Sequence, residues 1–286
     1  MTIAEKLRIT ELTKSNREME KWWQETMALT RRLFIQLQRR PSTLMAGIIQ
    51  PFIWLILFGA LFERAPAELF GEKGSYAQFL APGIIVFTAF SSALNGGLPV
   101  MFDREFGFLN RLLVAPLVSR FSIVAASVIY IVTYSFIQTA VIMVASALLG
   151  AGIPDITGIV VIGLIIFLIV MGITGLSLGL VFALPGHIEL LAVIFVINLP
   201  LFFASTALAP LSFMAGWLQI VASVNPLTIA IEPIRYIYQH EDWSFASQVM
   251  TTAWGSLTLT QVFVILLLLD VVVLLAIRPL LNRRLA

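Results

Sequence analysis

Six long apolar runs constrain the fold of this chain more than any other feature of its sequence. They cover residues 42–62, 79–101, 121–149, 156–184, 188–209 and 257–277. A helix of about 20 residues crosses the roughly 30 Å hydrocarbon core of a bilayer. With a mean hydropathy of +0.96 and 12% charged residues, the chain has too few polar side chains to cover a water-soluble globule. The sequence therefore predicts an all-α polytopic membrane protein with six transmembrane helices.

The basic residues are distributed unevenly between the two sides that six crossings would create. With both termini inside, roughly 15 Lys and Arg residues lie on the cytoplasmic side and about 3 outside, which the positive-inside rule favours strongly. The three external ones are Arg64, Lys73 and Arg235. The first 20 residues have no apolar core, so no cleavable signal peptide is expected. We expect a multi-pass protein of a bacterial plasma (inner) membrane with both termini cytoplasmic.

Several kinds of chemistry have no sequence support. The chain has no cysteine, and no Gly-Lys dipeptide that a phosphate-binding P-loop would need. His187 and His240 are isolated and lack metal-ligand spacing. We therefore expect no catalytic residue, no metal site, no cofactor and no nucleic-acid partner for this chain. Work on a substrate would need energy from another protein.

Residues 1–41 form a polar tail in which 18–40 have the pattern of an amphipathic helix. Near one face lie Met19, Trp23, Met27, Thr30, Phe34 and Leu37. Trp22 and Trp23 suit the lipid headgroup level, where Arg31 and Arg32 can meet anionic lipid. A membrane-surface anchor and a docking face for a cytosolic partner both remain open. Pro41 suits the first turn of a new helix, so we expect a bend at Arg40–Pro41.

The segment 102–116 between the second and third apolar runs is longer than a simple turn requires. Three charged residues come first, then a glycine, then a short helical pattern: Asp103, Arg104, Glu105, Gly107, Leu109, Arg111 and Leu112. Pro116 ends this pattern, and Arg120 precedes the next apolar run. A short helix with one apolar face can fit a groove in a partner, although a lipid-surface helix would share the pattern.

Residues 210–240 are too apolar for an exposed loop and too interrupted to span a membrane. The main markers are Pro210, Trp217, Asn225, Pro226 and Arg235. Two short helices that dip into the outer leaflet and are broken at Asn225–Pro226 would satisfy both properties.

Polar residues also occur inside the apolar runs. Gln50, Tyr134, Gln138 and Asn198 either hold helices together or line a translocation pathway. Asp270 would need an ion-pair partner such as an interfacial arginine, or else a proton, and we favour the ion pair. In the fourth run, Gly175 and Gly179 form a small-xxx-small pair for close helix packing, within the chain or between copies.

Together these motifs resemble those of type 2 ABC exporter permeases, in the branch of drug-resistance and lipo-oligosaccharide export permeases. The markers are Glu105-x-Gly107 followed by Ala115-Pro116 and Ser119-Arg120, and the block from Pro210 to Arg235. The resemblance covers nearly the whole chain. It implies a complex of two permeases, identical or homologous, with two cytosolic ABC ATPase subunits that bind ATP and Mg. It further implies that 102–116 is a coupling helix, that the amphipathic helix is an interface helix, and that 210–240 caps the exit.

The main hypothesis from the sequence is the permease subunit of an ATP-driven exporter for a lipophilic small molecule or lipid-like substrate. An alternative within the same class is export of a polysaccharide or lipo-oligosaccharide. An ion-coupled secondary transporter that uses Asp270 belongs to another class, as does a membrane scaffold without transport activity.

Overall fold

A computed structural model describes residues 3–62, 76–240 and 242–285, with side chains described from residue 17 to residue 280 of these ranges. Arg64 and Lys73, which the topology prediction counts as external, lie outside the described residues. The elements in chain order are α1 (Ile3–Gln38), α2 (Pro41–Leu61), α3 (Tyr76–Asn95), α4 (Leu98–Glu105), α5 (Phe108–Val114), α6 (Phe121–Ser146), a π-helical turn (Ala147–Ala151), α7 (Ile156–Ala183), α8 (His187–Phe203), a 3₁₀ turn (Leu211–Phe213), α9 (Gly216–Val224), α10 (Pro226–Gln239), β1 (Gln248–Thr252), β2 (Gly255–Thr258) and α11 (Leu259–Leu285).

The predicted all-α polytopic class is confirmed. Within the described residues, five helical segments are long and apolar enough to cross a membrane: α2, α3 continuing into α4, α6 with its π-helical turn, α7 and α11. The fifth predicted run, 188–209, forms the shorter α8 of 17 residues. It ends at Phe203 because the amide of Asn225 donates to the carbonyls of Leu201 (2.7 Å) and Ala204 (2.9 Å), which holds the chain in a turn there.

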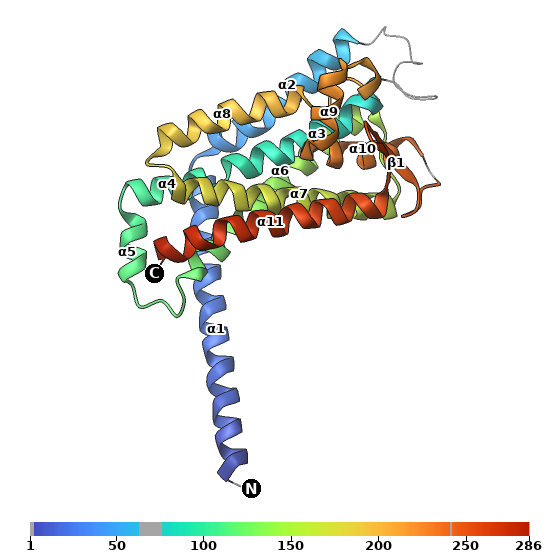
Figure 1. Cartoon of the computed structure of the whole chain (residues 1–286). Helices are drawn as coiled ribbons and strands as arrows, with labels where there is room; N and C mark the ends of the chain where they lie inside the picture. The colour runs from blue at the N-terminus through green and yellow to red at the C-terminus, as the bar shows by residue number, and fades with distance from the viewer. Residues whose placement is uncertain (1–2, 63–75, 241, 286) are drawn as a thin grey trace.

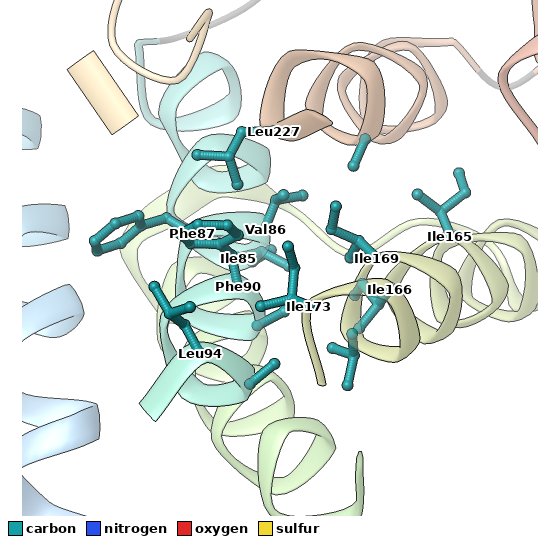
Figure 2. Packing of buried hydrophobic residues seen from close by; sticks show 14 of the residues in the cluster. Ile85, Val86, Phe87, Phe90, Leu94, Ile165, Ile166, Ile169, Ile173 and Leu227 are labelled. Carbon is teal, nitrogen blue, oxygen red and sulfur yellow. The ribbon is translucent and has the colours of Figure 1, made fainter. Parts of the chain in front are cut away.

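Helix α3 is the centre of the bundle and is buried almost throughout. It packs against α2, α6, α7 and α10, which surround it. Figure 2 shows Phe87 and Phe90 of α3 with Ile169 and Ile173 of α7 and Leu227 of α10 in this core. In lipid, close van der Waals packing rather than exclusion of water holds such helices together.

The second predicted run, 79–101, was expected as one helix, but the structure breaks it between α3 and α4. Gly96 and Gly97 follow each other there, and both Gly97 and the proline at 99 are poor residues for a helix interior. Ser177 of α7 donates to the Leu94 carbonyl (2.7 Å) and accepts from the Gly97 amide (3.1 Å). The hydroxyl thus satisfies backbone groups that the break releases.

Helix α1 projects from the bundle and runs across the direction of the membrane-crossing helices (Figure 1). It begins at Ile3, well before the predicted residue 18, and ends two residues before the predicted bend at Arg40–Pro41. Its buried face is shifted from the predicted one, although Thr30 and Leu37 belong to both. Thr26, Thr30, Leu33 and Leu37 are buried, whereas Trp23 is exposed, because α1 packs on α6 along that stripe.

Residues 248–258 contain a feature that the sequence reading missed. Strands β1 and β2 form an antiparallel hairpin whose tight turn pairs Thr252 with Gly255. A short run of Val, Met and Thr carries too weak an alternation to be recognised as a strand. Helix α11 begins after it at Leu259, two residues later than predicted.

Helices α7 and α11 pack closely along a glycine face. A Cβ at Gly175 would lie 2.9 Å from Val273, and one at Gly179 would lie 2.7 Å from Ile277. The sequence left open whether these glycines pack helices within one chain or between two copies, and in the structure they pack helices within the chain. This contact also corrects the expectation for Asp270, whose side chain lies against Gly172 and forms no ion pair with the described side chains.

Asp270 forms no ion pair with a described side chain of its own helix because the nearest following arginine is too far along the axis. The first arginine after Asp270 on α11 is Arg278, about 12 Å further along the axis at 1.5 Å per residue. Asp270 is 8% exposed, and its Oδ1 has no hydrogen-bond partner in the described part of the chain.

Candidate functional site: the 102–116 segment and the adjacent cavity

The segment 102–116 consists of two short helices joined at Gly107. The end of α4 carries the charged residues, and α5 follows directly after the glycine. Gly107 has φ of 76°, a left-handed conformation that costs other residues about 1 kcal/mol or more. Leu109 is buried, whereas Phe106 and Val114 are 77% and 85% exposed. The segment thus presents exposed apolar side chains on a backbone that is fixed to the bundle.

Asp103 joins this segment to α1. Its carboxylate accepts two hydrogen bonds from Arg32, at 2.5 and 2.6 Å, in the bidentate arrangement typical of strong arginine–carboxylate pairs. The guanidinium of Arg32 also lies 3.7 Å from the ring centroid of Phe108 in α5. One arginine of the predicted interface helix therefore contacts both halves of the predicted coupling segment.

Arg104 joins the segment to the end of α7. Its guanidinium donates to the carbonyls of Val181, Leu184 (2.5 Å) and Pro185 (2.7 Å). The last carbonyls of a helix have no partner within the helix, and a cation there also interacts favourably with the helix dipole.

Glu105 joins the segment to the start of α8. Its carboxylate lies 2.6 Å from Nδ1 of His187 and accepts a hydrogen bond from the His187 backbone amide at 3.3 Å. The side chain of His187, isolated in the sequence, is 31% exposed and paired with Glu105. The two residues are 82 positions apart, so sequence spacing gives no sign of this contact.

A further contact fixes the chain after α5. Glu25 of α1 accepts from the backbone amide of Val118 (2.9 Å) and from the hydroxyl of Ser122 (3.3 Å). The sequence predicted no contact between Glu25 and Ser122. Pro116 precedes this anchored stretch and Arg120 lies within it, and both are exposed.

The predicted coupling residues therefore fall into two groups. Asp103, Arg104 and Glu105 are engaged with α1, α7 and α8 of the same chain. Arg111 of α5 is exposed, as is the region around Phe106 and Val114. In the interface helix, Trp22 is half-buried and Trp23 exposed, Arg31 is exposed, and Phe34 packs edge-on against Tyr130 at 5.2 Å.

A cavity of about 1050 Å³ lies beside this segment, between α2, α3 and α6. Each helix contributes small or polar residues at helical spacing: Ser42, Thr43, Ala46, Gly47 and Gln50 from α2, Ser91, Ser92 and Asn95 from α3, and Tyr130, Tyr134 and Gln138 from α6. Leu33, Gln36, Leu37, Arg39 and Arg40 close it from the α1 side.

Three of the four predicted pathway residues line this cavity: Gln50, Tyr134 and Gln138. Their role in a pathway stays a prediction. Asn198 does not line it, although its amide donates to the hydroxyl of Ser91, which does (3.1 Å). The sequence reading missed Ser91, Ser92 and Asn95, whose i, i+1, i+4 spacing in the second apolar run was an available sign of a polar helix face.

The amide of Gln138 holds α6 to the cavity wall. It donates to the Tyr134 hydroxyl (2.8 Å) and lies 3.5 Å from the Leu44 carbonyl of α2. A Cβ at Gly47 would lie 2.1 Å from this amide nitrogen, so glycine allows the side chain to approach α2. Gln138 is 1% exposed.

The predicted 210–240 segment lies at the other end of the bundle, away from α4 and α5 (Figure 1). Helices α9 and α10 meet at Asn225–Pro226, where the sequence predicted the break. Pro210 precedes the 3₁₀ turn, and Trp217 in α9 is 69% exposed.

Arg235 is the anchor of α10. It is 5% exposed, donates to the carbonyls of Phe79 (3.2 Å) and Thr206 (2.6 Å), and pairs with Glu232. Its guanidinium also lies 3.8 Å from the ring centroid of Phe79. An arginine predicted at the exit is thus buried against α3 and the turn after α8.

At the same end, Asp155 caps the start of α7 by accepting from the Gly158 amide (3.0 Å). A hydrogen bond from the Thr157 hydroxyl is the main cause that holds the pKa of Asp155 below its usual value. Among the described residues, no group of three or more His, Asp or Glu side chains is placed to hold a metal ion.

The ABC-2 type transporter family profile matches residues 24–238. A protein of Porphyra purpurea named as transport permease ycf38 is 56% identical over 249 residues, or 87% of this chain and 86% of its own length. Its namesake in Cyanophora paradoxa is 53% identical over the same shares. A Mycobacterium tuberculosis protein named as doxorubicin resistance ABC transporter permease DrrC is 25% identical over 219 residues, or 74% of this chain and 75% of its own.

Proposed function

Because the chain belongs to the ABC-2 type transporter family, of which it has the multi-pass helical fold, we propose that it is the permease subunit of an ATP-driven exporter. In this proposal a separate cytosolic ABC ATPase binds ATP and Mg and supplies the energy. Two permeases, either two copies of this chain or this chain with a homologue, combine with two ATPase subunits. The termini are cytoplasmic, as the positive-inside rule favours.

The observation that carries the proposal is the way the 102–116 segment is fixed to the bundle. Three consecutive charged residues bind α1, the end of α7 and the start of α8. A push on α5 would therefore move several helices together, as a rigid body. ATP binding in a partner can favour one arrangement of the permease only through contacts that differ between the two states, and this surface offers such contacts.

The proposed cargo is a lipophilic small molecule or a lipid-like molecule that leaves the cytoplasm or the inner leaflet. The cavity of about 1050 Å³ supports this choice, because most of its lining consists of apolar and neutral polar side chains and its size suits a drug-sized ligand. The relative named for doxorubicin resistance points the same way. That relative comes from a bacterium, and we propose a bacterial inner membrane for this chain as well.

Two glycine-to-alanine substitutions, one in the segment 102–116 and one as a control, test the coupling role. Gly107→Ala places a side chain at φ 76° with nothing within 4 Å of the new Cβ, so it alters the angle between α4 and α5 without a clash. We expect ATP-driven transport in proteoliposomes containing the ATPase to fall about tenfold, while ATPase activity stays within twofold, since about 1 kcal/mol of strain is enough to move α5. Gly150→Ala is the matched control, with φ 95° and equally open space near the other end of the bundle.

Full transport by the Gly107→Ala protein would contradict the coupling role. Uphill transport by the purified permease without an ATPase, driven by an ion gradient and lost in Asp270→Asn, would instead select the ion-coupled alternative.

A further inference from the structure

We propose that the cavity between α2, α3 and α6 binds an amphiphile with an anionic head group, which Arg39 and Arg40 hold at the α1 end. This inference rests on the proposed transport function and adds the charge class of the cargo. It follows from the charges, the polar groups and the walls of the cavity.

The charge balance at the α1 end favours an anion. Arg39, Arg40 and Asp103 are the charged residues that line the cavity. Both oxygens of Asp103 accept hydrogen bonds from Arg32, so this carboxylate is already neutralised. Arg39 and Arg40 form no ion pair with the described side chains. Two positive charges are therefore left for a ligand, and a cationic head group would meet repulsion.

The start of α2 adds to this preference. Arg40 occupies the N-cap position of α2, and no side chain there accepts a hydrogen bond from the first turn. The amides at the start of a helix carry partial positive charge, which favours an anion close to Arg39 and Arg40.

The interior of the cavity is neutral and has polar and apolar walls. Gln50, Asn95 and Gln138 offer amides, while Leu37 and Phe102 offer apolar surface. From Arg40 to Gln50 the cavity follows α2 for about 15 Å, at 1.5 Å per residue. An amphiphile of that length can place its head group at the arginines and its uncharged body along the three helices.

The α2 wall would let such a ligand approach from the membrane. Most of α2 is exposed in this chain, including Ile53 at 44% and Leu57 at 61%. It contacts α3 and α6, and few of its residues are buried. A lipid-soluble molecule can therefore reach the cavity along a lightly packed helix.

Three fluorescent probes with one apolar body and different head groups test the inference: pyrenebutanoic acid, pyrenebutanol and pyrenebutyl-trimethylammonium. Binding to the full-length permease in phosphatidylcholine nanodiscs is followed by fluorescence anisotropy. We expect the acid to bind at least about tenfold more tightly than the alcohol or the ammonium, because paired arginines form charge-assisted hydrogen bonds to a carboxylate.

Two variants and a control locate the site. Combined Arg39→Gln and Arg40→Gln should weaken acid binding about tenfold or more and leave alcohol binding within twofold. Ala46→Trp should weaken all three probes, because residue 46 is exposed and lines the cavity, so the ring can fill it without displacing core side chains. Lys21→Gln, which removes an exposed charge outside the cavity lining, should leave all three affinities within twofold.

Equal affinity for the three probes, tighter binding of the ammonium, or acid binding that the double arginine variant does not change would overturn the inference. Phosphatidylglycerol added to the nanodiscs identifies the source of the anion. Displacement of the acid in the wild type identifies a membrane lipid as the occupant, and no displacement identifies a smaller free amphiphile of the same charge. Because no ATPase is present, failure of this test leaves ATP-driven transport untouched, and failure of transport leaves the binding result standing.

Discussion

At the residue scale, the charged run before Gly107 is mainly an internal fastening of the bundle. Sequence reasoning selected Asp103, Arg104 and Glu105 for contact with a partner protein. In the structure each of them has partners within the chain: Arg32, three carbonyls near the end of α7, and His187. The exposed surface next to them consists of α5 and the turn before it.

A double-mutant cycle on Arg32 and Asp103 tests this fastening. Arg32→Gln and Asp103→Asn should each lower the free energy of unfolding, and the double variant should show a coupling of about 1 kcal/mol, because the pair is bidentate yet 28% and 15% exposed. Denaturant unfolding in detergent measures it. Arg31→Gln, an exposed neighbour, is the control. A coupling indistinguishable from zero would mean that this ion pair does not help to hold α1 against the bundle.

The residue types at this site could be predicted, and their partners could not. Hydropathy and the glycine break single out 102–116, because a simple turn between two membrane helices needs far fewer residues than this segment contains. Arg32 and Asp103 are 71 positions apart, and Arg104 is 80 positions from Leu184. A single sequence carries no information about which distant residues meet, so only the folded chain shows these pairs.

At the element scale, prolines predicted where helices begin better than hydropathy predicted where they end. Pro41 begins α2 and Pro226 begins α10, since proline suits the first turn of a helix. The end of α8 was misplaced because its last turn depends on Asn225, which donates to two carbonyls from a later element. The break after α3 depends likewise on Ser177. Local patterns cannot reveal a helix end that a distant side chain stabilises.

Removing the arginine anchor of α10 should be costly. Arg235→Gln leaves the carbonyls of Phe79 and Thr206 and the carboxylate of Glu232 with fewer donors in a buried site. We expect the free energy of unfolding to fall by about 2–4 kcal/mol, since buried acceptors that lose a charged donor carry their full desolvation penalty. Arg278→Gln on α11 is the exposed control. Equal midpoints of thermal unfolding in detergent for the two variants would count against the anchor role.

At the whole-molecule scale, the membrane-crossing architecture followed from composition, while the packing of its helices did not. The apolar runs and the basic residues predicted a polytopic helical protein, and α4–α5 and α9–α10 do lie at opposite ends of the bundle (Figure 1). Hydropathy could not show that α3 is central or that α11 covers the glycine face of α7. Every apolar helix has a similar composition, and small residues alone do not name the partner helix.

The contact between Gly172 and Asp270 gives a compensation test of that packing. Gly172→Ala would place a Cβ 2.4 Å from Oδ1 of Asp270 and 2.9 Å from the side chain of Leu269, so these side chains of α11 must shift. We expect a loss of about 1–3 kcal/mol in the free energy of unfolding, as for overpacked cores. In an Asp270→Ala background the same substitution should cost clearly less, because the obstructing carboxylate is gone.

Gly163→Ala is the matched control for this pair, on the same helix with nothing within 4 Å of the new Cβ. It should be neutral or stabilise α7 slightly, since alanine has the higher helix propensity. Thermal unfolding of the four proteins in one detergent compares them. A cost for Gly172→Ala that Asp270→Ala does not reduce would mean that the carboxylate of Asp270 is not the obstacle at this position.

Because α2 is lightly packed, a ligand in the neighbouring cavity should change the hydrogen exchange of this helix and the thermal stability of the protein. A helix with few buried residues fluctuates more easily than its neighbours, so its amides should exchange hydrogen for deuterium early. A ligand bound between α2 and the inner helices would reduce the fluctuations of α2. The protein with bound ligand would then unfold at a higher temperature than the free protein, and this difference would grow with ligand concentration.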